Sequence, residues 1–246
     1  MRYLVLTDIH ANLPALEAVL EVASAEGYDR VLVLGDLVGY GADPNAVIDR
    51  VKALAPAAII RGNHDKASSG LYSTDDFNAV ARTAAMWTFN ALSPENREFL
   101  TTLPAGPLQV TPRLEICHGT PFDEDAYVFD AADAIDALDA AHGALCLFGH
   151  THLPVVFSRS PTGFNVALPT GAISRITLED GTRYLVNPGS VGQPRDGDAR
   201  AAFAVCDEDA SQVTFWRVPY RIDLAQEAIL AAGLPAPLAA RLAIGR

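Results

Sequence analysis

Five apolar runs in the first 150 residues of the chain each lead into polar residues. They start at Leu4, Val31, Ala57, Leu114 and Ala144, and each is only a few residues long. Continuous apolar runs of this length predict strands that are buried on both faces of a sheet. Helical crossovers are expected between several of them, and crossovers connect parallel strands. We therefore expect an α/β fold in which the carboxyl ends of these strands meet at one edge.

The helices are predicted by apolar residues that recur every three or four positions. Asn12 and Pro14 indicate the start of the first helix and Gly27 its end, while Ser93 followed by Pro94 is typical of another helix start. Further helices are expected at residues 44–54, 74–92 and 130–141. The segment 61–65, directly after the third apolar run, is expected to be a loop.

From residue 155 onward the pattern changes to short alternating or apolar runs separated by glycine, proline and aspartate. Such runs predict antiparallel hairpins, which we expect to form a second sheet. The expected strands cover residues 155–157, 164–166, 173–178, 184–186, 202–205 and 213–218.

Two Ala/Leu-rich helices are expected at the end of the chain. Asp223 with Gln226 indicates the start of one that ends at Gly233, and a shorter one follows at 235–243. We expect them to pack on the core or to join two copies in a homo-oligomer. The simplest organisation is a single domain over residues 1–246.

Composition and charge narrow the class of protein. Half of the 246 residues are hydrophobic, and the formal net charge of −12 leaves no broad basic surface for long DNA or RNA. The three cysteines lack CxxC spacing and lie in apolar runs, which predicts buried free thiols in a reducing compartment. We find no signal peptide and no apolar run of about 18 residues. These features predict a cytoplasmic protein without membrane association.

The residues that follow the five apolar runs are of the types that bind metals or move protons. Five of the six histidines lie there, and His142, the sixth, lies at an expected helix end and is not expected to be a ligand. Imidazole nitrogens combined with carboxylate and amide oxygens suit borderline transition metals. Because ligands bind at the carboxyl ends of strands in open α/β sheets, we expect one convergent site. The candidates are Asp8, His10, Asp36, Asn63, His64, Asp65, His118, His150 and His152.

The loop from Asn187 to Gly197 allows two interpretations. Its glycines and prolines are typical of a flexible connection. Alternatively, its backbone N–H groups and Arg195 form a rim that contacts an anionic substrate.

In order and spacing, the candidate residues resemble the five signature motifs of the calcineurin-like metallophosphoesterases. The motifs are Asp8-x-His10, Gly35-Asp36, Gly62-Asn63-His64-Asp65, His118-Gly119 and Gly149-His150-Thr151-His152. The loop Asn187–Arg195 also resembles a segment of small bacterial members. The resemblance implies a four-layer α/β/β/α sandwich of two mixed sheets that holds two divalent ions, such as Mn, Fe, Zn or Ni.

The resemblance also implies a role for each motif residue. One ion would be bound by Asp8, His10 and His152, the other by Asn63, His118 and His150, and Asp36 would be shared between them. Two such ions can share a water, and the resulting hydroxide would attack phosphorus in line. His64 would be the acid that protonates the leaving oxygen, and Asp65 would either orient the His64 imidazole or be structural.

One departure from the family bears on the substrate. The protein Ser/Thr phosphatases carry GDxVDRG, whose arginine binds phosphate, whereas this chain has Gly35-Asp36-Leu37-Val38-Gly39-Tyr40-Gly41. Arg61 and Arg195 are the candidates to replace that arginine. A phosphodiester needs less cationic compensation than a monoester, so we expect a small phosphodiester, such as a nucleotide. The alternatives are a phosphomonoesterase or phosphoprotein phosphatase, a hydrolase of non-phosphate bonds, and a non-catalytic scaffold of the same fold.

Overall fold

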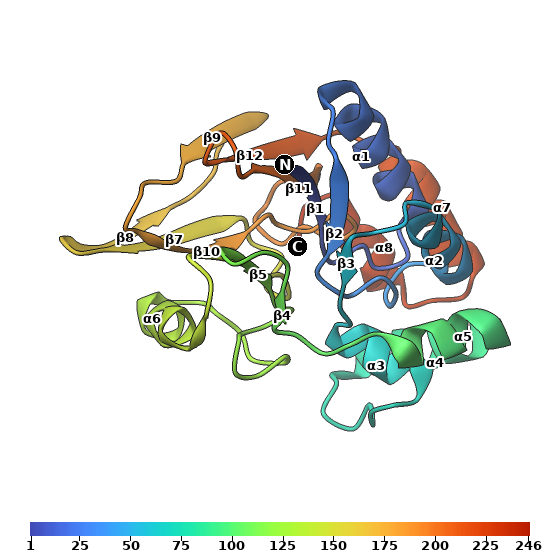
Figure 1. Cartoon of the computed structure of the whole chain (residues 1–246). Coiled ribbons are helices and arrows are strands. Elements are labelled where there is room, and N and C mark those ends of the chain that lie inside the picture. The colour runs from blue at the N-terminus through green and yellow to red at the C-terminus, as the bar shows by residue number, and fades with distance from the viewer.

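The strands form two six-stranded sheets that face each other (Figure 1). The computed structural model describes residues 1–246. The first sheet contains β1 (Arg2–Leu6), β2 (Arg30–Val33), β3 (Ala58–Ile59), β9 (Ile173–Thr177), β11 (Ala201–Asp207) and β12 (Gln212–Val218). The second contains β4 (Leu108–Gln109), β5 (Leu114–Ile116), β6 (Leu145–Leu147), β7 (Val155–Ser160), β8 (Gly163–Ala167) and β10 (Arg183–Asn187). Their orders are β3-β2-β1-β11-β12-β9 and β4-β5-β6-β10-β7-β8.

Helices cover the outer face of each sheet, so the predicted α/β/β/α sandwich is confirmed. The first sheet is covered by α1 (Leu13–Glu26) and α2 (Pro44–Ala53), and the second by α6 (Ala131–Ala140). Three helices follow β3 along the chain, namely α3 (Asn63–Ser69), α4 (Ala79–Ala91) and α5 (Pro94–Thr102). The last two, α7 (Ile222–Ala231) and α8 (Ala236–Leu242), pack with α4 in a separate apolar cluster.

The first sheet is apolar on both faces because its strands contribute to two cores. In β1, Leu4 and Leu6 belong to the core beneath α1 and α2, whereas Tyr3 and Val5 belong to the core between the sheets. Successive side chains of a strand point to opposite faces, so a strand between two cores must be apolar at every position. This explains the unbroken apolar runs in the sequence.

The second half of the chain does not form a sheet of its own, and that expectation is wrong. β9, β11 and β12 extend the first sheet, whereas β7, β8 and β10 extend the second. β10 also pairs with β6 in parallel, with Tyr184 opposite Leu145. The local pattern predicts where these strands lie, but their partners depend on tertiary packing.

The expected loop at 61–65 is also wrong from Asn63 onward, where α3 begins. The Asp65 carboxylate accepts a hydrogen bond from the Gly62 N–H at 3.0 Å, which closes the first helical turn. Asn63, His64 and Asp65 are therefore held on a short helix.

Two other helix starts differ from the prediction. α4 starts only at Ala79, because the Asn78 side chain accepts hydrogen bonds from the next turn and caps the helix there. α7 starts at Ile222, so Asp223 lies in the first turn and does not cap it. None of the helices is long and apolar enough to cross a membrane.

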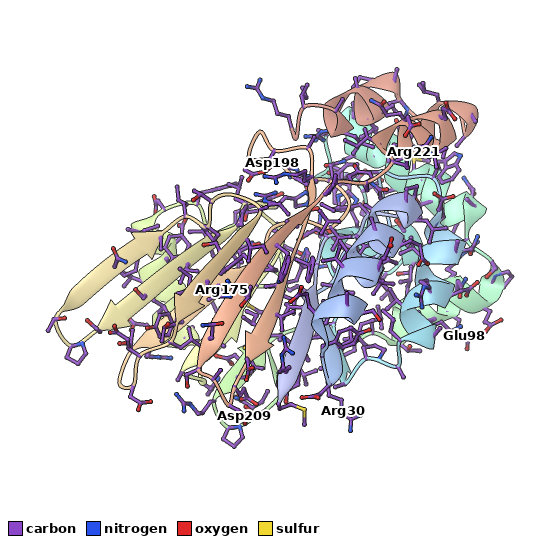
Figure 2. All side chains as sticks on the ribbon, turned by 90° about the horizontal axis from the view of Figure 1, so that it is seen from above. Arg30, Glu98, Arg175, Asp198, Asp209 and Arg221 are labelled. Carbon is purple, nitrogen blue, oxygen red and sulfur yellow. The ribbon has the colours of Figure 1, made fainter.

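Charged side chains lie mainly on the outside of the sandwich, where Figure 2 labels examples such as Glu98 on α5. Glu115 of β5 is an exception, since it is only 1% exposed. Its carboxylate accepts hydrogen bonds from the N–H groups of His142 at 2.7 Å and Gly143 at 3.1 Å. It thereby fixes the turn between α6 and β6.

Glu115→Ala is expected to lower the free energy of unfolding by about 2 kcal/mol, because two backbone N–H groups lose their acceptor. Urea unfolding followed by circular dichroism measures the change. Glu98→Ala, on an exposed helix face, is the control and should change stability by less than about 0.5 kcal/mol. Equal effects of the two variants would contradict this role for Glu115.

Candidate metal centre and active site

The parallel strands of both sheets end at one edge of the sandwich, and the loops there carry two clusters of ligand atoms. We call Asp8, His10, Asp36 and His152 the first cluster, and Asp36, His118 and His150 the second cluster. Within each cluster the ligand atoms lie within 4.8 Å of one another. Asp36 belongs to both clusters.

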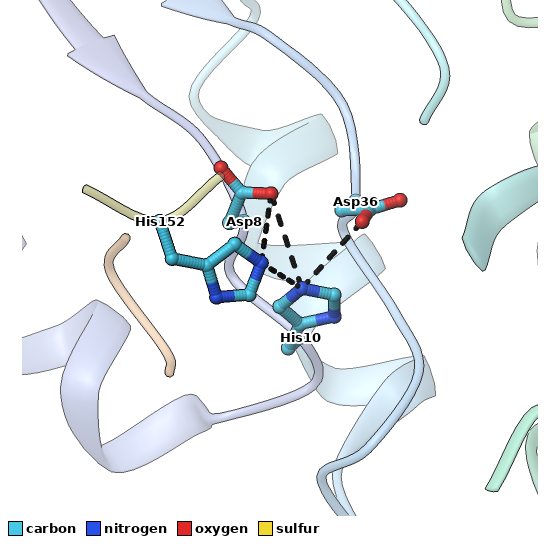
Figure 3. Close-up of side chains that lie close together, drawn as sticks. All are labelled: Asp8, His10, Asp36 and His152. Carbon is cyan, nitrogen blue, oxygen red and sulfur yellow. Dashed lines mark hydrogen bonds and ion pairs between the residues drawn. The ribbon is translucent and has the colours of Figure 1, made fainter. Parts of the chain in front are cut away.

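The first cluster joins the loops after β1, β2 and β6 (Figure 3). His152 Nε2 lies 3.2 Å from Asp8 Oδ1 and 3.1 Å from His10 Nε2. His10 Nε2 lies 3.5 Å from Asp36 Oδ2. All four side chains are at most 1% exposed. So dense a group of unprotonated nitrogen and oxygen atoms needs a positive charge at its centre.

The second cluster joins the loops after β2, β5 and β6. His118 Nε2 lies 3.5 Å from Asp36 Oδ2 and 3.1 Å from His150 Nδ1. Asn63 lies beside this cluster, because its chain neighbours Gly62 and His64 both lie against Asp36. The amide oxygen Oδ1 of Asn63 is buried and has no hydrogen-bond partner. An unpaired buried amide oxygen of this kind is able to bind a cation.

Each clustered histidine uses its second ring nitrogen to contact a backbone carbonyl. This is the usual arrangement of metal-binding histidines, because it fixes the tautomer and aims the lone pair of the other nitrogen at the metal. The pairs are His10 Nδ1 with Val38 O at 3.1 Å, His118 Nδ1 with Leu34 O at 2.8 Å, His150 Nε2 with Asp125 O at 3.0 Å, and His152 Nδ1 with Gln193 O at 2.6 Å.

The backbone at the site is strained. Five cluster residues have φ between 50° and 66°, a region that side chains other than glycine rarely adopt: Asp8, His10, Asp36, His150 and His152. Each such residue costs about 1–3 kcal/mol, and these conformations gather at functional sites. Here backbone hydrogen bonds between the ligand loops help to hold them, including Asp8 N to Gly35 O at 3.1 Å and His10 N to Asp36 O at 3.0 Å.

Glycines let the ligand loops approach each other. A Cβ atom on Gly149 would lie 2.1 Å from Thr7 Oγ1 and 2.8 Å from Asp8 Oδ2. A Cβ atom on Gly62 would lie 2.2 Å from Asp36 Oδ1. Any larger side chain at either position would displace a carboxylate of the site.

Burial sets the protonation of the rings. It lowers the pKa of His150 to about 3 and also lowers the pKa values of His10 and His152, so these rings are neutral and their lone pairs are free. Burial also disfavours the charged form of His118, but the Asp36 carboxylate outweighs it and raises the pKa to about 10. The site thus contains three neutral rings, a protonated His118 and two carboxylates. A divalent cation bound there would displace the His118 proton, and the resulting donor set fits borderline divalent cations.

His64 borders the first cluster and is not part of it. Its ring is 4% exposed and lies edge-on to His10, with the centroids 5.0 Å apart. Tyr40 and Phe77 flank it at 4.3 and 4.9 Å, and its Nδ1 atom has no hydrogen-bond partner. Burial lowers its pKa to about 4.

Asp65 does not contact the His64 imidazole through a hydrogen bond. Its two carboxylate oxygens accept from the backbone N–H groups of Gly62 at 3.0 Å and Val38 at 3.2 Å. Burial, with a further contribution from Asp36, raises its pKa to about 7. These contacts tie the His64 helix to the loop after β2.

The two candidate arginines differ in their surroundings. Arg61 donates to both carboxylate oxygens of Glu124, from Nε at 3.1 Å and from Nη2 at 3.0 Å. The Arg195 guanidinium donates to Gln193 Oε1 at 3.1 Å and lies over the ring of Tyr40, the neighbour of His64. Arg195 therefore lies on the side of the site where His64 is, while Arg61 is engaged by an internal partner.

The loop after β10 is a rigid support for the site. Its N–H groups at Val191 and Gly192 donate to the carbonyls of Thr7 and Asp8 at 3.1 and 3.0 Å, so they are not free for an anion. Asn187 Nδ2 donates to Gly149 O at 2.7 Å and to Thr151 Oγ1 at 3.0 Å, beside the two histidines of that loop. Of the rim expected in this loop, the Arg195 guanidinium contacts Gln193 and Tyr40 and makes no ion pair with a carboxylate.

Several residues of the site were not predicted from sequence. The carbonyls of Asp125 and Gln193 orient histidines but leave no trace in side-chain patterns. Tyr127, whose ring stacks on His150 with centroids 3.9 Å apart, could have been noticed as an aromatic residue shortly after His118-Gly119. His142 is 79% exposed at its side chain and lies outside the clusters, as expected.

Comparison with known proteins identifies the family. The profile of the calcineurin-like phosphoesterase superfamily domain matches residues 1–211. The chain belongs to this superfamily. As a member, it is a metal-dependent phosphoester hydrolase.

Relatives support the assignment over almost the whole chain. An uncharacterized protein of Methanocaldococcus jannaschii is 36% identical over 98% of this chain and 97% of its own length. The crystal structure of a metallophosphoesterase from Sphaerobacter thermophilus is 40% identical, covers 100% of this chain and 99% of its own, and has a TM-score of 0.88. Phosphodiesterase YfcE of Escherichia coli K12 is 27% identical over 87% of this chain and 91% of its own length.

Asn187→Ala is expected to weaken Mn²⁺ binding by about 10- to 100-fold, because the support of the His150 and His152 loop is lost. Isothermal titration with Mn²⁺ measures the affinity. Asn165→Ala, the same substitution at an exposed position of β8, is the control and should bind Mn²⁺ like the wild type. An unchanged affinity of Asn187→Ala would show that the loop does not support the site.

Proposed function

We propose that this phosphoesterase hydrolyses small phosphodiesters with the help of two divalent transition-metal ions. The observation that carries the proposal is the sharing of Asp36 between two adjoining ligand clusters. Asp8, His10 and His152 would hold one ion, and Asn63, His118 and His150 the other, with Asp36 between them. When bound, such a pair supplies an activated water and offsets the charge of the phosphoryl group. Because both sheets contribute ligands, we treat residues 1–246 as one domain.

His64 is the residue we assign to proton transfer. It is close to the first cluster but contributes no ligand atom to it, and its Nδ1 atom has no partner within the protein. Burial alone keeps this ring neutral near pH 7, but a phosphate anion beside it would favour the protonated form, because burial lowers its pKa to about 4 and a nearby negative charge raises it. The imidazolium can then donate a hydrogen bond to a phosphoryl oxygen and a proton to the leaving oxygen. We assign Asp65 a positioning role, because its carboxylate binds the start of the helix that carries His64 and the loop after β2.

The substrate preference follows from the supply of positive charge near His64. Arg61 is engaged by Glu124, which leaves Arg195 as the guanidinium that we assign to phosphate binding. One such group suits a singly charged diester better than a doubly charged monoester. The name of the relative YfcE, a phosphodiesterase, supports this choice.

The Mn²⁺-loaded protein is expected to hydrolyse bis-p-nitrophenyl phosphate with a kcat/KM about tenfold or more above that for p-nitrophenyl phosphate. This ratio corresponds to about 1.4 kcal/mol in favour of the diester transition state. Release of p-nitrophenol measures both reactions, before and after removal of the metal by a chelator. A higher kcat/KM for the monoester would assign the protein to the phosphomonoesterases instead.

Two histidine variants, one in the second cluster and one outside both clusters, test whether hydrolysis depends on the metal. His150→Ala removes a second-cluster ligand and is expected to abolish hydrolysis at limiting Mn²⁺, whereas His142→Ala removes an exposed side chain and should keep full activity. Undiminished activity of His150→Ala under these conditions would contradict the ligand assignment.

His64→Ala is expected to lower kcat by about 10²- to 10⁴-fold while the bound Mn²⁺ per chain stays unchanged, because a proton donor is lost and no ligand is. Steady-state kinetics and metal analysis of the same sample separate the two effects. Loss of Mn²⁺ with an unchanged rate per occupied site would mean that His64 is a ligand.

A further inference from the structure

A series of aromatic rings leads from the second cluster to the surface. The Tyr127 ring stacks on His150, with centroids 3.9 Å apart and 27° between the planes. The Phe129 ring stacks on Tyr127 at 5.0 Å and 7°. Tyr127 is 43% exposed and Phe129 is 64% exposed. We call these two rings the Tyr127–Phe129 platform. Exposed apolar surface beside a polar site is typical of a surface that binds a ligand.

The burial of the segment shows which way the platform faces. Val128, between the two rings, is 3% exposed and packs in the core beneath α6. Tyr127 and Phe129 on either side of it are exposed, so their rings lie on the solvent side of the segment. The Phe129 N–H donates to Asp133 Oδ2 at 2.9 Å, which fixes this end of the segment to α6.

The segment before the platform is fastened to the metal centre. Lys66 of α3, 5% exposed, donates to Glu124 Oε1 at 2.9 Å and to Asp125 Oδ1 at 2.8 Å. Arg61 binds the same Glu124, and the Asp125 carbonyl contacts His150 Nε2. A buried lysine and a histidine of the second cluster therefore hold this segment, so the rings occupy a fixed place relative to that cluster. A preorganised surface of this kind loses little entropy when it binds a ligand.

We propose that the Tyr127–Phe129 platform binds the base of a nucleoside, so that the substrates are phosphodiesters of nucleosides. The inference rests on the proposed function and specifies its substrate class. Bases stack on exposed aromatic side chains in many nucleic-acid-binding proteins. Phe129, the more exposed ring, stacks on Tyr127 on the side away from His150, so the base would lie at the outer end of the platform and the sugar between the base and the phosphate. Because a phenyl ring offers no hydrogen bond to a base edge, adenine, guanine and pyrimidines should all be accepted.

The test compares two ligands that differ only in the base, adenosine 5′-monophosphate and ribose 5-phosphate. Calorimetric titration of the Mn²⁺-loaded protein is expected to show about tenfold tighter binding of the nucleotide. Phe129→Leu, which removes the ring but keeps an apolar side chain, should reduce this ratio to near one without changing the affinity for ribose 5-phosphate. Phe129→Trp, which keeps an aromatic ring, should keep the preference for the nucleotide over ribose 5-phosphate.

Phe122→Leu is the matched control, since Phe122 is 59% exposed in the same part of the chain and stacks on no other ring. It should keep the wild-type ratio. Equal affinity of the wild type for both ligands, or a ratio that Phe129→Leu leaves unchanged, would overturn the inference. Phenyl phosphate that binds as tightly as the nucleotide would assign the platform to aryl esters and also overturn it. Hydrolysis of bis-p-nitrophenyl phosphate by the same samples tests the proposed function separately.

Discussion

The rest of the structure depends on the burial of two carboxylates, Asp8 and Asp36, among buried imidazoles. Both are at most 1% exposed, and an ionised carboxylate removed from water is stable only beside a compensating positive charge. Protons supply part of that charge on His118, whose pKa is raised to about 10. Divalent cations would supply it more fully and would explain why three of the other rings are kept neutral.

The fold meets this constraint by joining two sheets at one edge. Asp8, His10 and Asp36 come from strand ends of the first sheet, and the histidines of the motifs at 118 and 150–152 from the second. The core between the sheets is built from apolar residues, and the clustered ligand residues lie where strands end. The strained backbone at five of these positions is the cost of aiming so many side chains at one point, and the hydrogen bonds between the loops offset it.

The residues of the two clusters could be predicted from the sequence because each follows an apolar strand, and strand ends are predictable from local pattern. The pairing of β10 with β6 could not, since both sheets offer similar edges and only packing selects between them. The contact of Arg61 with Glu124 joins residues 63 positions apart and is equally invisible in the sequence. The same holds for the carbonyls that orient His150 and His152, because every residue has a carbonyl and only the fold decides which one faces a ring.

The central claim is that Asp36 joins two cation sites. Anomalous diffraction from crystals grown with Mn²⁺ tests it most directly, because it locates each ion independently of activity. We predict two peaks about 3.5–4 Å apart, the spacing of two-metal phosphoesterase sites, with the Asp36 carboxylate between them. A single peak, or peaks away from Asp36, would contradict the account.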